Sequence, residues 1–291
     1  MSSQIDPTAI PELAELQRVL SGLAVRGSFS LAYSGGLDSR FLAYTAKLLG
    51  FMPALYHIIG PQIAPDETSQ ALKDAEAMGF EATLVPASSL SLPELAAAGR
   101  ERCYVCKKHL FEALLEVSQA SGTGPLCDGT NLSDLDVYRP GRRALEELGV
   151  RSPLALASIS KARIREIGRE IGFPKPDQMA RPCLLTRFPY GVSPRQSSLQ
   201  AIADAEELVA EDAFGAKLRY RLRMPQPGEP VLHVAQASLP EGMSEEAAAR
   251  ELDRLCAKIE ARWSEALPHL HWALVAQLSG FYDRMPEAEA K

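Results

Sequence analysis

The sequence contains no Gly-Lys-Ser or Gly-Lys-Thr, the tripeptides that place a lysine on the β- and γ-phosphates in a Walker loop. No apolar run approaches the roughly 20 residues of a membrane-spanning helix, and the N-terminus lacks the basic-then-apolar build of a signal peptide. A net charge of −6 argues against a nonspecific nucleic-acid binder, because such proteins usually carry a basic surface. We therefore expect a cytoplasmic protein with no membrane partner and no stable nucleic-acid partner.

Cysteine is scarce, with five in 291 residues, and the odd number argues against a disulfide framework. Cys127 falls in an apolar segment and Cys256 in a helical one, so both are interpreted as buried apolar residues. The apolar fraction of 46% allows a sizeable core, and the length suits one large domain or two ordinary ones. Cys103, Cys106 and Cys183 remain as the candidate thiols for chemistry.

Strand and helix patterns alternate through the first part of the chain. Strands are expected at 29–33, 53–59, 81–85 and 125–128, and helices at 11–20, 38–49, 66–78, 104–119, 140–148 and 160–171. This alternation predicts an α/β fold with a doubly wound parallel sheet, whose ligands bind at the carboxyl ends of the strands.

After residue 191 the regular alternation of expected strands and helices ends. Helices are expected at 194–211 and 244–264, strands at 217–223, 231–235 and 270–278, and a Pro/Gly-rich turn at 224–230. The sequence therefore predicts a first domain over residues 1–191 and a smaller α+β domain over residues 192–291.

The stretch from Ser34 to Ser39 joins the first expected strand to the next helix and reads Ser-Gly-Gly-Leu-Asp-Ser. Gly35 and Gly36 can take backbone angles that side chains forbid, and N–H groups at a helix start point toward an anion that the helix dipole also favours. Without a Walker lysine, such a loop suits a pyrophosphate leaving group, with chemistry at the α-phosphate. The pattern predicts ATP binding and adenylyl transfer, and the alternative is an ordinary strand-to-helix turn.

Two more polar stretches follow. One closes the fourth strand at the same predicted sheet edge, and its residues are either ligand contacts or a simple turn: Asp128, Gly129, Thr130 and Asn131. The other places three guanidiniums, those of Arg139, Arg142 and Arg143, where a helix begins. Cations oppose the helix dipole there, so an anionic ligand is expected.

The remaining cysteines have distinctive surroundings. Cys103 and Cys106 form a CxxC pair at a helix start, the spacing of a redox pair or of part of a metal or cluster site. A zinc site would require two further ligands, and the sequence contains no second CxxC and no His pair near these cysteines. Cys183 stands between Arg181 and Arg187 in an irregular segment, and neighbouring cations favour the nucleophilic thiolate.

These residues together resemble one family. The hexapeptide SGGLDS resembles the pyrophosphate loop of the N-type ATP pyrophosphatases, whose fold is of the adenine nucleotide alpha-hydrolase type. The more specific stretches DGTN, YRPG, GVRSPL and PCLLTRFPYG resemble the LarE-type ATP-dependent sulfur transferases, and the likeness covers most of residues 25–220. That family activates a carboxylate of pyridinium-3,5-biscarboxylic acid mononucleotide as an acyl-adenylate and then delivers sulfur, in the synthesis of the nickel-pincer nucleotide.

The resemblance implies roles for individual residues. ATP would be held by the glycine loop, namely Ser34, Gly35, Gly36, Asp38 and Ser39, with Asp38 near Mg²⁺. Substrate phosphate and carboxylate groups would be held by Arg187, Arg219 and Arg221. Cys183 matches the sulfur-bearing cysteine, which some members sacrifice to leave dehydroalanine. Members with three cysteines hold a [4Fe-4S] cluster, and Cys103, Cys106 and Cys183 fit that version, which we expect here.

The chain departs from the family in two places. The segment Asp177-Gln178-Met179-Ala180-Arg181 lacks the lysine of the family's usual Asp-Lys-Pro-Ala, and the sequence after Arg221 diverges from the family. Glu206 or Glu207 is then a candidate acidic ligand, and the alternative, which we favour, is that both lie on a solvated helix face. Two other functions therefore stay open: thiolation of a tRNA base by the same activation, and a non-catalytic sulfur or cluster carrier that binds ATP. The expected partners are an anionic nucleotide and further copies of the chain.

Overall fold

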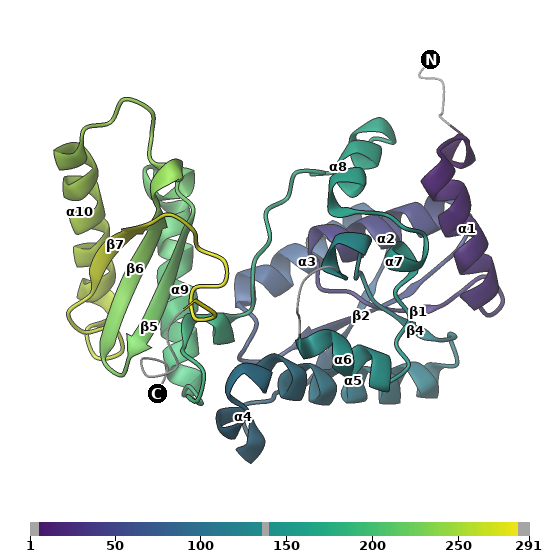
Figure 1. The fold of residues 1–291 in the computed structure, drawn as a ribbon, viewed down its shortest axis with the longest axis horizontal. Helices are drawn as coiled ribbons and strands as arrows, with labels where there is room; N and C mark the ends of the chain where they lie inside the picture. The colour runs from purple at the N-terminus through teal and green to yellow at the C-terminus, as the bar shows by residue number, and fades with distance from the viewer. Residues whose placement is uncertain (1–5, 136–139, 285–291) are drawn as a thin grey trace. The chain divides into compact units, whose positions relative to one another are not determined.

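The structure is a computed structural model that describes residues 6–135 and 140–284. The chain forms two compact units (Figure 1). The first comprises the described residues within Met1–Gly60, Glu67–Ser89 and Cys103–Arg181, and the second those within Pro61–Asp66, Leu90–Arg102 and Pro182–Lys291. No helix in the described ranges is long and apolar enough to cross a membrane.

The first unit is built on a parallel sheet with strand order β3-β2-β1-β4. Its strands are β1 (Ser30–Ala32), β2 (Ala54–Ile59), β3 (Ala82–Pro86) and β4 (Leu126–Cys127). The helices between and around them are α1 (Pro11–Leu23), α2 (Leu37–Leu48), α3 (Pro65–Ala77), α5 (Arg102–Ser121), α6 (Pro140–Glu147), α7 (Pro153–Leu156) and α8 (Lys161–Glu170). The predicted doubly wound parallel sheet is confirmed.

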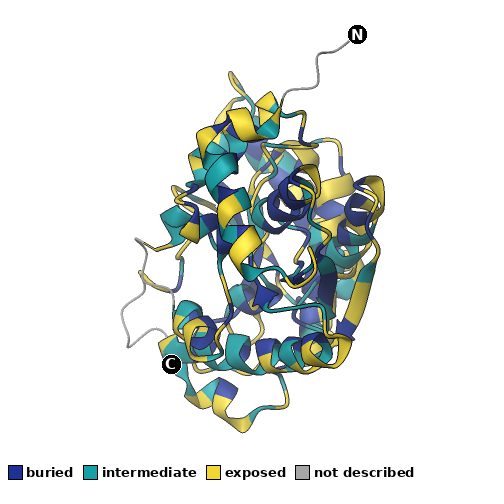
Figure 2. Cartoon of the chain, turned by 90° about the vertical axis from the view of Figure 1, so that its right-hand side faces the viewer, coloured by how far each residue is buried: buried dark blue, intermediate teal, exposed yellow. Residues whose placement is uncertain are grey.

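Both faces of this sheet are buried, as a doubly wound fold requires. The strand register places Leu31, Leu55 and Cys127 on one face, where they pack with α1, α2 and α8. Tyr56 and Leu126 point to the other face and pack with α5 and α6. Figure 2 shows the resulting alternation of buried and exposed residues along the helices. Each fully buried leucine contributes about 1.5–3 kcal/mol relative to an exposed one.

The strand order creates a switch point beside β1. The chain moves outward from β1 through β2 to β3, and then returns to place β4 on the opposite side of β1. In open α/β sheets, ligands bind outside the carboxyl ends of the strands at such a reversal. The loops that follow β1 and β4 therefore form the expected binding edge.

The second unit contains a mixed sheet of order β5-β6-β7, in which β6 is antiparallel to β5 and parallel to β7. These strands are Tyr220–Gln226, Glu229–Ala235 and His271–Val275, and α9 (Gln196–Glu211) packs on β5 while α10 (Glu245–Trp263) packs on β7. The unit also holds the short helix α4 (Pro93–Ala97). The predicted α+β character of the C-terminal region is confirmed.

The prediction of a turn over residues 224–230 was too long. β5 continues to Gln226 and β6 begins at Glu229. Pro225 fits within the strand because the register shifts between Arg223 and Gln226, and a residue without an N–H is tolerated at such an irregularity. The last strand is also shorter than predicted, and α4 and α7 were missed because each is too short to display a helical period.

Asp212 is the C-cap residue of α9 in the second unit, and its carboxylate is buried. It accepts hydrogen bonds from the N–H groups of Phe214 and Gly215, and a bidentate pair from Arg254 at 2.8 and 2.9 Å. The Arg254 guanidinium and these N–H groups hold the pKa of Asp212 well below its ordinary value of 3.8. The stabilisation is therefore present above that value and is lost as the pH falls below it.

We expect Asp212→Asn to lower the free energy of unfolding at neutral pH by about 1–2 kcal/mol, since Arg254 is partly exposed and solvent weakens the pair. The difference between the two proteins should shrink toward pH 3, because below pH 3.8 the unfolded chain takes up a proton at Asp212 while the folded protein keeps this carboxylate ionised. Urea titrations at both pH values measure this. A difference that does not change with pH would mean that the charge of Asp212 contributes nothing.

Candidate functional site

The glycine loop lies between the end of β1 and the start of α2, at the switch point. Gly35 has φ +72°, and a Cβ there would lie 2.5 Å from the Cβ of Ala71, so only glycine fits. Gly36 is the N-cap of α2 and makes no side-chain cap hydrogen bond. Ser34 Oγ accepts from the Gly36 N–H at 3.3 Å and lies 3.2 Å from Ser39 Oγ. The loop thus presents helix-start N–H groups and hydroxyls, the donors that an anion requires.

The β4 loop meets the glycine loop through Gly129. A Cβ at Gly129 would lie 2.8 Å from the Ser39 nitrogen, so this close approach requires glycine. Asp128 accepts hydrogen bonds from Thr130 and from Ser152. The structure therefore brings this predicted stretch against the glycine loop, with the Asp128 side chain holding the β4 loop itself.

Asn131 has a different local role. Its side chain caps the short helix Leu132–Asp134, and Asp134 accepts in return from the Asn131 N–H, which forms a capping box. The Asn131 side chain is buried, and its contacts are those of a local turn. Ligand contact by the four residues Asp128 to Asn131 stays a prediction.

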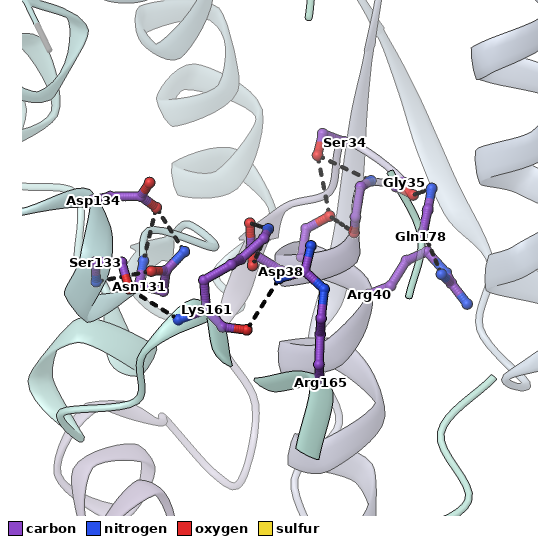
Figure 3. A network of polar contacts seen from close by, with 12 residues as sticks. Ser34, Gly35, Asp38, Arg40, Asn131, Ser133, Asp134, Lys161, Arg165 and Gln178 are labelled. Carbon is purple, nitrogen blue, oxygen red and sulfur yellow. Dashed lines mark hydrogen bonds and ion pairs between the residues drawn. The ribbon is translucent and has the colours of Figure 1, made fainter. Parts of the chain in front are cut away.

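Asp38 forms a two-oxygen contact with Lys161 (Figure 3), with the ammonium 2.7 Å from Oδ1 and 2.5 Å from Oδ2. Burial raises the pKa of Asp38, and the positive charge of Lys161 opposes that rise. Arg165 lies one turn further along α8 and also acts on Asp38 electrostatically. A carboxylate and two cations therefore converge beside the glycine loop.

This convergence has a clear chemical use. Carboxylate oxygens are ligands that Mg²⁺ accepts, and lysine and arginine are the usual partners of phosphate oxygens. The residues fit a magnesium-bound polyphosphate, in which Asp38 would be the metal ligand and Lys161 and Arg165 would contact the phosphates, and this binding stays a prediction. Our sequence interpretation missed both cations, although Lys161 is the first residue of α8, where a cation opposes the helix dipole.

Two of the three candidate cysteines lie on α5 in the first unit. Cys103 is exposed, and Cys106, one turn later, is buried and receives a hydrogen bond from Ser89 Oγ at 3.0 Å. Thiolates one helical turn apart fit two ligands of a cluster. Among the described residues of this unit, no further Cys, His, Asp or Glu completes a metal-binding group with them. A third protein ligand would have to come from outside the described residues of this unit. The three-cysteine site stays a prediction.

Cys183 belongs to the second unit and is half-buried. It is the N-cap of the short helix Leu184–Arg187, and its carbonyl accepts from Thr186. The other two cysteines behave as predicted: Cys127 and Cys256 are buried, and burial raises the pKa of each to about 12. Neither is a thiolate near neutral pH.

The predicted substrate arginines differ in their surroundings. Arg187 is 2% exposed and makes a bidentate ion pair with Glu206 at 2.7 and 2.9 Å, while Arg219 is exposed and Arg221 half-buried. Glu206 is thus a structural partner of the Cys183 segment. Arg139 lies outside the described residues. Substrate binding by these arginines stays a prediction.

The arginines at the start of α6 have carboxylate partners on the same helix. Arg142 pairs with Glu146 and Arg143 with Glu147, each four residues further on, and Arg143 stacks on Tyr104 at 3.9 Å. These i,i+4 contacts offset the unfavourable helix dipole, so the charge pattern requires no anionic ligand at these two arginines.

Fold and loop together define an α/β protein of the Rossmann-like, adenine nucleotide alpha-hydrolase type. No protein-family model matches the chain. An uncharacterised protein of Synechocystis is 38% identical over 177 residues, which are 60% of this chain and 66% of the relative, so the match spans just under two thirds of that protein. An uncharacterised protein of Methanocaldococcus jannaschii is 31% identical over 186 residues, 64% of this chain and 71% of the relative.

The chain belongs to the family of that Methanocaldococcus jannaschii protein. It is also a distant homologue, LarE-like, of the pyridinium-3,5-bisthiocarboxylic acid mononucleotide synthase of Lactiplantibacillus plantarum. The identity is 26% over 209 residues, which are 71% of this chain and 72% of the synthase.

Proposed function

We propose that this protein is an ATP-dependent sulfur transferase that adenylates a carboxylate of pyridinium-3,5-biscarboxylic acid mononucleotide and replaces the activated oxygen with sulfur. The observation that carries the proposal is the convergence of Asp38, Lys161 and Arg165 beside a glycine loop at the switch point. The substrate is taken from the homologous synthase of Lactiplantibacillus plantarum.

In the activation step, a carboxylate oxygen of the substrate attacks the α-phosphorus of ATP, and the bond to the β-phosphate oxygen breaks. Pyrophosphate leaves with its charge stabilised by the loop N–H groups and by Lys161 and Arg165. Mg²⁺ held by Asp38 would neutralise phosphate charge. Lys161 therefore supplies the cation that a Walker lysine supplies elsewhere, although it comes from a helix far along the chain.

In the sulfur step, a sulfur nucleophile attacks the acyl carbon and AMP leaves. If Cys183 is sacrificed, its Sγ first forms a thioester. The Cβ–Sγ bond then breaks with loss of the Cα proton, which leaves dehydroalanine and a thiocarboxylate. In the cluster version, Cys103, Cys106 and Cys183 would be the three thiolate ligands of a [4Fe-4S] cluster, which supplies an open iron for an additional sulfide.

The products of ATP cleavage test this function. We expect radiolabelled ATP to yield AMP and pyrophosphate only when the carboxylated nucleotide is present, because the loop is built to release pyrophosphate. Chromatography of the products measures this, and a reaction that contains protein and ATP without the carboxylated nucleotide is the control. Primary formation of ADP and orthophosphate would contradict adenylyl transfer, and AMP formation that depends on tRNA would favour the tRNA-thiolating alternative.

A further inference from the structure

Gln178 contacts the glycine loop from a segment far along the chain. It lies in the irregular stretch after α8, and its side-chain Nε2 donates a hydrogen bond to the Gly35 carbonyl at 3.1 Å. Its Oε1 accepts a hydrogen bond from Arg40 Nη1 (Figure 3). One amide therefore joins the backbone of the loop to the first turns of α2.

The Arg40 side of this contact is rigidly held. Arg40 is 1% exposed, donates to the Pro174 carbonyl at 2.8 Å, pairs with Asp74 at 3.4 Å and lies over the ring of Phe173 at 5.0 Å. Lys175 also reaches Asp74, at 2.9 Å. The segment before Gln178 is thus anchored to the core of the first unit, and the position of the Gln178 amide is fixed in turn.

Fixing the Gly35 carbonyl has a consequence for the next N–H group. The peptide unit between Gly35 and Gly36 is planar and trans, so the carbonyl and the N–H point in opposite directions. Two glycines give this unit wide conformational freedom, because glycine visits both signs of φ. Its Gly36 N–H donates to Ser34 Oγ at 3.3 Å, and Gln178 holds the opposite side of the unit. The donor on the Gly35 oxygen and the acceptor Ser34 Oγ therefore together set the direction of the Gly36 N–H, at the start of α2.

We propose that Gln178 is a positioning residue for the glycine loop, which holds the Gly36 N–H in the orientation that receives the polyphosphate of ATP. The amide of glutamine carries a donor and an acceptor on one uncharged side chain. A lysine here could donate to Gly35 but would meet the Arg40 guanidinium, and a glutamate could accept from Arg40 but would offer its oxygens to the Gly35 carbonyl. The inference rests on the proposed use of ATP.

Two substitutions of nearly the same size test it in the full-length protein. Gln178→Met removes both hydrogen bonds, and Gln178→Glu keeps the Arg40 contact as an ion pair while it loses the donor to Gly35. The dissociation constant of Mg-ATP is measured by calorimetry, KM and kcat for ATP by pyrophosphate release, and the thermal midpoint by calorimetric scanning. Gln200→Met, on the exposed surface of α9, is the matched control.

We expect both variants to bind Mg-ATP about ten-fold or more weakly, the equivalent of one lost hydrogen bond, with a matching rise in KM and a smaller change in kcat. Gln178→Glu should bind ATP weakly while its thermal midpoint stays at or above that of the wild type, a separation that a merely structural role does not produce. Wild-type affinity in both variants would overturn this inference alone. Failure of the wild-type protein to bind Mg-ATP would overturn the proposed function and this inference together.

Discussion

Lys161→Met is expected to slow substrate-dependent pyrophosphate release by about 10²–10³-fold, because it removes, from a partly buried site, the positive charge that we propose stabilises the leaving group. Asp38, which burial makes costly to ionise, also loses its closest cation. The loss should therefore appear in kcat/KM for ATP. Steady-state pyrophosphate release under saturating carboxylated nucleotide is the measurement.

Lys108→Met is the matched control for this prediction. Lys108 lies on α5 in the same unit and pairs with Glu147 at 3.3 Å on the surface. It should retain wild-type kinetics, and the thermal midpoint of Lys161→Met should stay within a few degrees of the wild type. A Lys161→Met enzyme with unchanged kcat/KM would remove this residue, and the Asp38 pair, from the mechanism.

Cys183→Ala is expected to abolish sulfur transfer under either sulfur chemistry. Adenylation should still release one pyrophosphate per chain, because this step precedes the sulfur step and uses the proposed ATP-binding residues of the first unit. Cys103→Ala separates the two chemistries. If the three thiolates hold a cluster, anaerobically prepared wild-type protein should contain about four irons per chain, and each single replacement should remove iron and multiple turnover. Iron analysis and turnover counts under anaerobic conditions measure this.

The sacrificial chemistry makes a contrasting prediction. Cys103→Ala should then retain one full turnover, and intact-mass analysis should find spent protein lighter by the elements of H₂S, with dehydroalanine at residue 183. Cys256→Ala is the control, since that thiol is buried and burial raises its pKa. Full sulfur transfer by Cys183→Ala would rule out both chemistries.

The sequence by itself determined the parallel sheet, the position of the glycine loop and the burial of Cys127 and Cys256. Each of these follows from short-range pattern: apolar runs of strand length, helical periodicity, and glycines directly between a strand and a helix. The packed sheet confirms them because neighbouring residues already specify which face of each element is apolar.

Only the tertiary structure decided which side chains meet at the loop. Lys161 is 123 residues from Asp38 in the sequence, and Gln178 is 143 residues from Gly35. Charge pattern drew attention to the arginines near α6, where Glu146 and Glu147 provide local partners for Arg142 and Arg143. Strand order and helix packing bring distant segments to one edge of the sheet, and no local period in the sequence encodes that arrangement.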